Sequence, residues 1–243
     1  QVTKNWTLPK LGTPVIQIDI DPAECGKSYP GAVGVCGDPE TAVEMIHAAM
    51  EGKKTYGKWA QYARNCVEDW NGSVTAFRTS GDIPIRPERL CTDLSEILPE
   101  NAIVAADTGY SAIWAATMID ITSPEQTFIR AAGSLGWAFP ASLGAKCAAP
   151  DRPVVCFAGD GALWYHISEL ETAKRWGINT VTVVNNNGVL GQCLKGINKA
   201  YQSDTGEKNH MSNFVPTDFS KIARDMGCYG VRVCDPADIK TEI

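Results

Sequence analysis

The chain has 243 residues, of which 44% are hydrophobic and 21% are charged, and its formal net charge at pH 7 is −6. This composition excludes a disordered chain, and no apolar run approaches the twenty residues of a membrane span. The acidic balance, without a basic stripe to neutralise a phosphate backbone, also argues against nucleic-acid binding.

The nine cysteines are scattered, and none forms a C-x-x-C pair. This pattern predicts reduced, mostly buried thiols in a cytoplasmic protein rather than a zinc or disulfide framework. The first ten residues, QVTKNWTLPK, have neither the apolar segment nor the cleavage site of a signal peptide. Because a starting Met is missing and the last residues look helical, we expect a processed or fragmentary chain.

The N-terminal quarter predicts a small strand, strand, helix unit. Strands are expected over residues 14–21 and 32–36, and an acidic residue followed by proline opens a helix over 39–50. This unit is too small to stand alone. Residues 53–82 are richer in Lys, Gly, Asn and Ser and predict a linker with one amphipathic helix around 59–70.

From residue 83 onward, helices and strands alternate. Strands such as VVCFA and TVTVV are continuous apolar runs, which is typical of parallel strands covered by helices on both faces. The pattern predicts an α/β fold with a doubly wound parallel sheet, in which ligands bind beyond the carboxyl ends of the strands. Helices are expected over 87–98, 138–149, 167–176 and 217–226, and strands over 102–106, 153–158, 179–184 and 230–234.

Polar or glycine-containing turns follow three of these strands, with the sequences ADTGYS, AGDGALW and NNNGVLGQ. In the second turn, Gly159 and Gly161 allow the backbone to approach an anion, and the following helix directs free N–H groups at it. A carboxylate at Asp160 would repel a phosphate unless a divalent cation lay between them.

A hard cation such as Mg²⁺ prefers about six oxygen ligands. Asp160 supplies a carboxylate, Asn187 on the next strand end supplies an amide oxygen, and the turn at 188–190 supplies a backbone carbonyl. Phosphate oxygens and water would complete the shell. The alternative is that Asp160 caps a helix and the asparagines form a turn, since both residue types favour those places.

The combined spacing, in which G-D-G is followed by 24 residues and then by two asparagines, resembles the signature of thiamine diphosphate (ThDP) enzymes. The segments DTGYSAIWAA, GSLGWAFPASLGAK and GDGALWYHISELETAKRWGI resemble acetolactate synthase (acetohydroxyacid synthase) large subunits, and the similarity covers nearly the whole chain. It implies that 1–52 is the end of a Rossmann-like middle domain, 53–82 a linker and 83–243 the ThDP (diphosphate-binding) domain. The family's pyrimidine-binding domain is expected to be absent from the chain.

The resemblance also implies roles for individual residues. Mg²⁺ would be coordinated by the side chains of Asp160 and Asn187 and by the carbonyl of Val189. Leu135 would wedge between the two rings of the cofactor and hold it bent, while the carbonyl of Gly133 would accept a hydrogen bond from its 4'-amino group. Diphosphate contacts would come from Gly109, Tyr110, Ser111, Gly159, Gly161 and Ala162. The family often has Ser where this chain has Ala162, so only a backbone contact is expected there.

By the same resemblance, the activity is a ThDP- and Mg²⁺-dependent decarboxylation and carboligation of 2-oxo acids. The expected reaction converts pyruvate to 2-acetolactate, in branched-chain amino acid biosynthesis. The family's catalytic Glu lies on the pyrimidine-binding domain, of the same or another subunit, so no catalytic residue is assigned to this chain, and the chain alone is expected to be inactive. A homodimer or homotetramer is implied for the complete enzyme.

One position departs from the family. Gly196 falls where typical acetolactate synthases carry a Trp that lines the substrate entrance. Two alternatives therefore stand beside acetolactate synthesis. One is another ThDP-dependent 2-oxo acid decarboxylase or carboligase, and the other is a non-catalytic fragment that only binds the cofactor.

Overall fold

The computed structural model describes residues 8–10, 12–53, 57–131, 133–202 and 208–243. The chain divides into two compact units, Gln1–Cys66 and Val67–Ile243. No helix in the described ranges is long and apolar enough to cross a membrane.

Among its described residues, the smaller unit contains two parallel strands, a helix that follows them and the first turns of a longer helix. Strand β1 (Ile16–Asp19) pairs with β2 (Val33–Cys36), with Ile16 opposite Val33. Helix α1 (Pro39–Met50) begins where its sequence predicts, because the Asp38 carboxylate accepts the free N–H of Thr41 at 2.9 Å. The predicted strand, strand, helix order is therefore confirmed for this unit.

Helix α2 (Gly57–Arg78) is longer than the predicted 59–70. Its last turns contain Gly72, Ser73 and Thr75, which have low helix propensity, so local sequence does not predict a helix there. Val74 in this part is buried in the core of the larger unit. Tertiary packing therefore stabilises a helical segment that local propensity does not favour.

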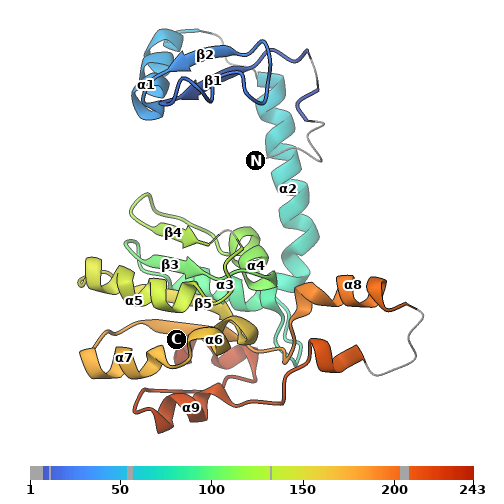
Figure 1. Ribbon diagram of the computed structural model, residues 1–243, viewed down its shortest axis with the longest axis vertical. Coiled ribbons are helices and arrows are strands. Elements are labelled where there is room, and N and C mark those ends of the chain that lie inside the picture. The colour runs from blue at the N-terminus through green and yellow to red at the C-terminus, as the bar shows by residue number, and fades with distance from the viewer. Residues whose placement is uncertain (1–7, 11, 54–56, 132, 203–207) are drawn as a thin grey trace. The chain divides into compact units, whose positions relative to one another are not determined.

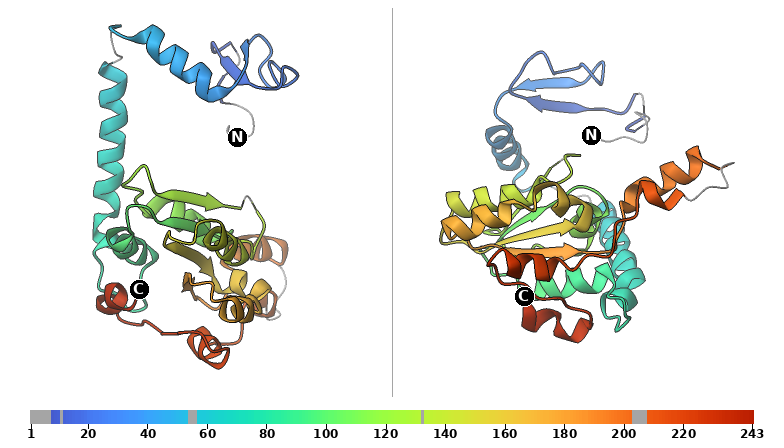
Figure 2. Two further views of the ribbon diagram at one scale, coloured as in Figure 1. Left: turned by 90° about the vertical axis from the view of Figure 1, so that its left-hand side faces the viewer. Right: turned by 60° about the horizontal axis from the view of Figure 1, so that its bottom comes forward.

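Four parallel strands form the sheet of the larger unit, in the order β4-β3-β5-β6 (Figures 1 and 2). From β3 the chain moves outward to β4, returns to the other side of β3 with β5, and continues to β6. The order thus reverses between β3 and β5, and ligands of parallel α/β sheets commonly bind at the carboxyl ends of the strands beside such a switch point. The strands span Ile103–Ala106 (β3), Thr127–Arg130 (β4), Val154–Gly159 (β5) and Val181–Asn185 (β6).

Helices cover both faces of this sheet, because successive side chains of each buried strand point to opposite faces. Val104 and Phe157 pack on the face covered by α2, α3 and α4, whereas Ala105 and Cys156 pack on the face covered by α5, α6 and α9. The helices span Pro87–Ile97 (α3), Tyr110–Met118 (α4), Ala138–Ala148 (α5), Asp160–His166 (α6), Glu169–Trp176 (α7) and Phe219–Asp225 (α9).

Several predicted elements differ from the structure. The strand expected over 230–234 is wrong: a Cβ on Gly230 would lie 2.4 Å from the Ser220 carbonyl oxygen, and Arg224 donates to the Gly230 carbonyl, so this segment runs tightly against α9. The predicted helix 167–176 corresponds to α7, which begins two residues later, and the separate helix α6 before it was not predicted. Helix α4, strand β4 and four late elements were not predicted, the latter being α8 (Gly191–Ala200), α10 (Ile239–Glu242) and the 3-10 turns Lys208–Met211 and Pro236–Asp238.

Candidate functional site

The carboxyl ends of β5 and β6 bring the two predicted metal-binding segments together. Gly159 is the last residue of β5 and pairs with Asn185 at the end of β6. Asp160 begins α6, and its Oδ2 accepts the N–H of Gly188 at 2.5 Å, while its Oδ1 accepts the N–H of Gly161 at 2.7 Å. The carboxylate of Asp160 therefore contacts the turn that carries Asn187 and Val189.

Asp160 is only 3% exposed. Burial raises the pKa of its carboxyl group, and hydrogen bonds from the backbone N–H groups of Gly161 and of the turn 187–189 oppose that rise. No described Lys, Arg or His forms an ion pair with it. A buried carboxylate without a cationic side chain beside it suits a bound cation, because the cation's charge would offset the cost of burial.

The other two predicted ligands lie in the adjoining turn. The amide oxygen of Asn187 accepts the N–H of Val189 at 3.2 Å, and the carbonyl of Val189 accepts the N–H of Gly191 at 2.9 Å. Each of these oxygens has a second lone pair. Together with the Asp160 carboxylate they form a donor set made only of oxygen, which fits Mg²⁺ better than a soft metal.

A short antiparallel bridge holds this turn in place. Val189 pairs with Asn213, with Leu190 N donating to the Ser212 carbonyl and Phe214 N donating to the Gly188 carbonyl, both at 2.8 Å. These residues are not predictable from the sequence, because a bridge between segments 24 positions apart leaves no periodic signal.

The bridge also explains why Gly161 must be small. A Cβ there would lie 2.6 Å from Leu190 Cδ2 and 3.3 Å from Phe214 Cε2. The side chain of the following residue, Ala162, is buried in the core. Only the backbone of these two residues is left to face a ligand at the start of α6.

The end of β3 approaches the same place from the other side of the switch point. Gly109, with φ of 89°, precedes α4. A Cβ on Gly159 would lie 3.1 Å from the hydroxyl oxygen of the buried Ser111, so the β3 and β5 turns touch. The Tyr110 ring lies against Gly191 at the start of α8, since a Cβ on that glycine would lie 3.1 Å from Tyr110 Cδ2. The structure thus brings all three predicted turns together.

The loop before α5 carries the remaining predicted residues. Gly133 is exposed and has φ of 99°, and Leu135 packs partly against the core cluster that includes α5 and α6. Gly136, which the sequence analysis did not identify, has φ of 92°. A Cβ on it would lie 2.6 Å from Tyr165 Cβ, so a glycine is required for the loop to reach α6.

Asp107, directly after β3, was also not assigned a role from the sequence. Its carboxylate is fully buried and accepts N–H groups of Thr108 and Gly136 at 2.8 Å and of Ala138 at 2.7 Å. A charged residue immediately after a buried strand was the signal that could have identified it.

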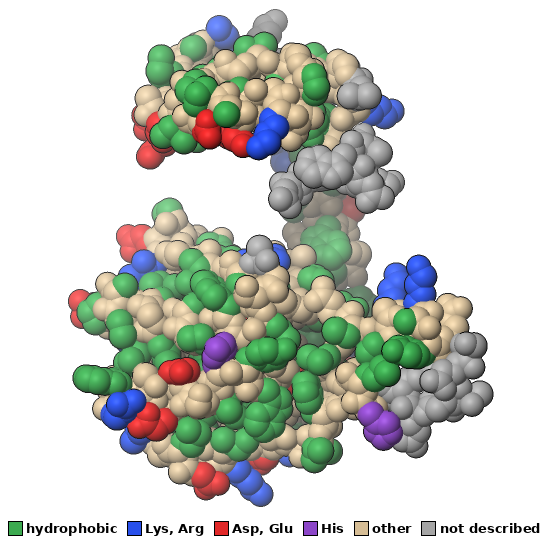
Figure 3. Space-filling model, viewed as in Figure 1, with side chains coloured by type: hydrophobic (Ala, Val, Ile, Leu, Met, Phe, Trp, Pro, Cys, Tyr) green, Lys and Arg blue, Asp and Glu red, His purple; other side chains and the backbone are tan. Residues whose placement is uncertain are grey.

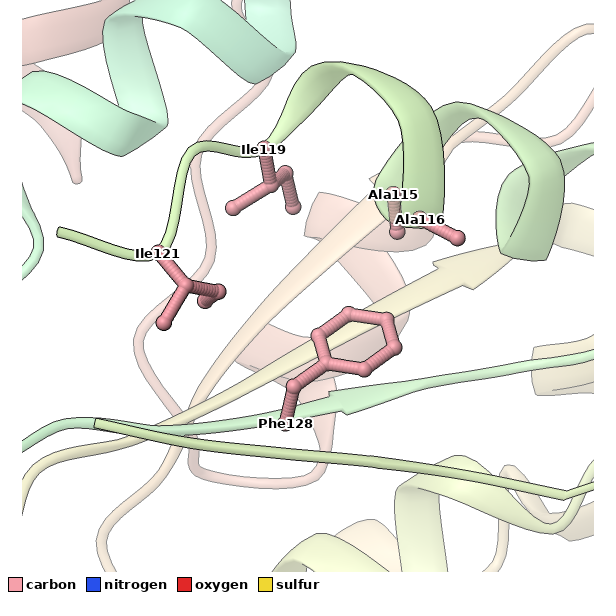
Figure 4. A pocket seen from close by; sticks show the side chains of 5 residues that line it. All are labelled: Ala115, Ala116, Ile119, Ile121 and Phe128. Carbon is pink, nitrogen blue, oxygen red and sulfur yellow. The ribbon is translucent and has the colours of Figure 1, made fainter. Parts of the chain in front are cut away.

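Within the described ranges of the chain, neither a cluster of metal-binding side chains nor one apolar pocket provides a competing site. Among the residues that the structure describes, no three His, Cys, Asp or Glu side chains gather to hold a metal. A pocket of about 270 Å³ is lined only by apolar side chains, from the end of α4, the segment after it and β4 (Figure 4). It offers no polar group to orient a substrate. Apolar side chains are also abundant on the face shown in Figure 3.

Comparison with known proteins relates the chain to a protein family. Residues 107–243 match the family described as thiamine pyrophosphate enzyme, C-terminal TPP binding domain. Over 94% of the chain, 30% of residues are identical to the acetolactate synthase large subunit of Haemophilus influenzae, and over 90% of it, 32% are identical to the acetolactate synthase of Mycobacterium leprae. A probable acetolactate synthase large subunit of Methanococcus aeolicus is 28% identical over 93% of the chain. The matched regions cover 40%, 36% and 39% of these three proteins, respectively.

Proposed function

Because the chain belongs to the thiamine pyrophosphate enzymes, through their C-terminal TPP-binding domain, we propose that it holds Mg²⁺ and the diphosphate of ThDP at the ends of β3, β5 and β6. The observation that carries this proposal is the buried Asp160 carboxylate in contact with the turn 187–189. In this proposal Asp160 and Asn187 bind Mg²⁺ by side chain, and Val189 binds it by its carbonyl. The all-oxygen donor set supports that choice of metal.

Two glycine turns would bind the diphosphate. In the first turn, the backbone of Gly159, Gly161 and Ala162 would face the ligand. This agrees with the packing of Leu190 and Phe214, which leaves no room for a side chain at Gly161. Tyr110 and Ser111, which follow Gly109, would grip it from the β3 side, with the Ser111 hydroxyl as a donor. The close approach of Ser111 to Gly159 supports one binding site shared by both turns.

Gly133 and Leu135 would receive the rings of the cofactor. When bound, ThDP supplies the electron-accepting group that allows cleavage or formation of a bond next to a 2-oxo group. The role of the chain is to orient it: the exposed loop before α5 presents the Gly133 carbonyl and the partly buried Leu135 side chain near the β3 turn. A bent cofactor keeps its internal base close to the proton that the base must remove.

For the complete protein, we propose Mg²⁺-dependent decarboxylation and carboligation of 2-oxo acids, with pyruvate as substrate and 2-acetolactate as product. The names of the three relatives support this activity. A second candidate is another 2-oxo acid decarboxylase or carboligase, which Gly196 favours. The Trp side chain of the family is missing at this exposed residue of α8. A Cβ there would meet no atom within 4 Å, so the position has room for a larger side chain.

The proposal extends to domains and partners. Residues 1–52 would end a Rossmann-like middle domain, 53–82 would link it to the rest, and 83–243 would form a doubly wound ThDP domain. A pyrimidine-binding domain of the same or another subunit would complete the site, in a cytoplasmic homodimer or homotetramer. Exposed aromatic side chains beside the site support a partner surface, namely Tyr110, Trp137, Trp164 and Tyr165.

Calorimetric titration of the chain with ThDP and Mg²⁺ tests cofactor binding. We expect binding that requires Mg²⁺ and that Asp160→Ala weakens by about 100-fold, as expected for loss of a metal ligand. Asp225→Ala is the control, because it removes an exposed carboxylate at the end of α9. Equal affinities for these two variants, or binding that EDTA leaves unchanged, would refute the metal site.

Product analysis separates the candidate activities. The full-length protein that contains this chain is incubated with pyruvate, ThDP and Mg²⁺. Acetolactate formation supports the proposed synthase, whereas acetaldehyde alone supports a decarboxylase. A Gly196→Trp variant that gains acetolactate at the expense of acetaldehyde would assign the difference to this position.

A further inference from the structure

The two residues after β3 hold both ends of the loop that precedes α5. At the first end, the Thr108 hydroxyl donates to the Ala131 carbonyl at 3.3 Å and accepts the N–H of Gly133 at 3.1 Å. One side chain thus contacts the end of the β4 segment and the first glycine of the loop. Because a hydroxyl can donate and accept at the same time, both bonds can exist together.

At the second end, the Asp107 carboxylate binds the start of α5. Its Oδ1 accepts the N–H of Gly136 and its Oδ2 accepts the N–H of Ala138. Its Oδ1 also accepts the N–H of the neighbouring Thr108. Leu135 lies between the two fixed ends, next to Gly136.

The Asp107 side chain has no exposure to solvent, and its hydrogen-bond partners are backbone N–H groups. Burying a carboxylate without a charged partner is costly unless such donors satisfy it. An apolar residue of the same size would leave the N–H groups of Thr108, Gly136 and Ala138 without this acceptor. The Asp107 carboxylate therefore holds the N–H groups of this loop in place.

We propose that Asp107 and Thr108 are positioning residues, which clamp segment 133–137 before α5 at both ends and thereby set the places of the Gly133 carbonyl and the Leu135 side chain. This proposal rests on the proposed function for its link to ThDP. The clamp itself is a property of the chain without the cofactor. Neither residue needs to touch the cofactor to act in this way.

Amide hydrogen exchange of the peptide covering 131–138 tests the clamp in the chain alone. We expect exchange to rise by about tenfold in Asp107→Asn and in Thr108→Val, since each loses one hydrogen-bonded end of the loop. In the Asn variant, one carboxylate oxygen becomes an N–H donor that faces another donor. Thr108→Ser keeps the hydroxyl and should restore the parent rate.

A control shows whether the change is specific to this loop. Asp235→Asn alters a carboxylate that also accepts a backbone N–H, that of Ala237, but it caps a distant turn. Its exchange over 131–138 should match the parent. Parent-like exchange in both Asp107→Asn and Thr108→Val overturns the clamp. If Asp107→Asn does not fold, the comparison of Thr108→Val with Thr108→Ser decides.

The link to the cofactor needs a second measurement, made on the full-length protein. We expect Thr108→Val to slow deuterium exchange at C2 of bound ThDP by about tenfold or more, because small misplacements of reacting groups have large effects. Its affinity for ThDP and Mg²⁺ should stay within about threefold of the parent, since the diphosphate contacts are intact. Unchanged C2 exchange in a variant with a loosened loop overturns the positioning role. Failure of the parent to bind ThDP refutes the proposed function instead, and amide exchange still judges the clamp.

Discussion

Gly136 allows the sharpest test of how the loop before α5 is packed. An alanine there would place its Cβ 2.6 Å from Tyr165 Cβ and 3.2 Å from the Ala162 carbonyl oxygen, at φ of 92°. A positive φ costs a non-glycine residue about 1–2 kcal/mol. Forcing a methyl group into a packed contact costs about 1–3 kcal/mol more. We therefore expect Gly136→Ala to lower the free energy of unfolding by about 2–5 kcal/mol.

Gly133→Ala provides a matched control in the same loop. Gly133 also has a positive φ, of 99°, but a Cβ there would meet no atom within 4 Å. This variant should therefore lose only the conformational part, about 1–2 kcal/mol. The additional loss of stability in Gly136→Ala, about 1–3 kcal/mol from the packed contact, should lower its melting temperature by roughly 2–12 °C relative to Gly133→Ala. The conversion is about 2–4 °C per kcal/mol in a chain of this size.

Differential scanning calorimetry of the two variants and the parent measures this difference. The obstacle at Gly136 is a Cβ and a backbone carbonyl of α6, neither of which can move without the helix. Since α6 begins at Asp160, the same variant should also bind ThDP and Mg²⁺ more weakly than Gly133→Ala. Equal melting temperatures for the two variants would refute the close packing of the loop on α6.

Four further predictions concern stability, thiol reactivity, the pH dependence of stability and the metal turn. Arg152 donates to backbone carbonyls of three residues and to a threonine hydroxyl, so Arg152→Met should lower the free energy of unfolding in urea by about 2 kcal/mol. Burial raises the pKa of Cys156 to about 12, so iodoacetamide at pH 8 should modify the exposed Cys147 and spare Cys156, as mass spectrometry can show. Because unfolded Cys156 loses its proton near pH 9 and folded Cys156 keeps it, this thiol should lower stability between pH 9 and 12 by about 1.4 kcal/mol per pH unit. Cys156→Ala should remove this contribution in urea titrations and leave that of the buried Cys91, whose pKa is also raised to about 12. Gly161→Ala should displace Leu190 and weaken Mg²⁺-dependent ThDP binding by about tenfold in calorimetry, while Gly144→Ala, with no atom within 4 Å of its Cβ position, should not.

Elements with strong local signals were predictable from sequence alone. Helix α1 matches its predicted bounds because an acidic cap and a proline define its start. Helix α4 was missed for the opposite reason. Its sequence, YSAIWAATM, is apolar on nearly all sides, so no helical period distinguishes it from a buried strand or a loop.

Strand β4 shows a second limit. It has four residues, TFIR, at the edge of the sheet, and its pairing with β3 joins segments more than twenty positions apart. So short an apolar run carries no period that separates a strand from a turn. Conversely, the segment 230–234 has strand-like composition, but it packs against α9 with Gly230 close to a backbone carbonyl. Composition indicates what a segment could form, and its neighbours decide what it does form.

The candidate site divides along the same line. Residues that end strands, such as Asp160 and Asn187, were found because polar side chains interrupt apolar runs. Asp107 interrupts one as well, but the N–H groups that it accepts belong to Gly136 and Ala138, about thirty positions away. No local pattern contains that relationship. The sequence alone identifies residues at the ends of the strands, whereas the residues that fix one strand end to the next are brought together only in the folded chain.

This distinction leads to an expectation about the site as a whole. If the two buried carboxylates have different roles, Asp160 acts through a cation and Asp107 acts through backbone N–H groups. Replacing Asp160 by Asn should then abolish the dependence of binding on Mg²⁺ and leave amide exchange over 131–138 unchanged. Replacing Asp107 by Asn should raise amide exchange over 131–138 and leave the dependence of binding on Mg²⁺ unchanged, because the three N–H groups that Asp107 accepts are satisfied without a metal. If either substitution produced both effects, the two carboxylates would form one coupled unit, and the separation of metal binding from loop positioning would be wrong.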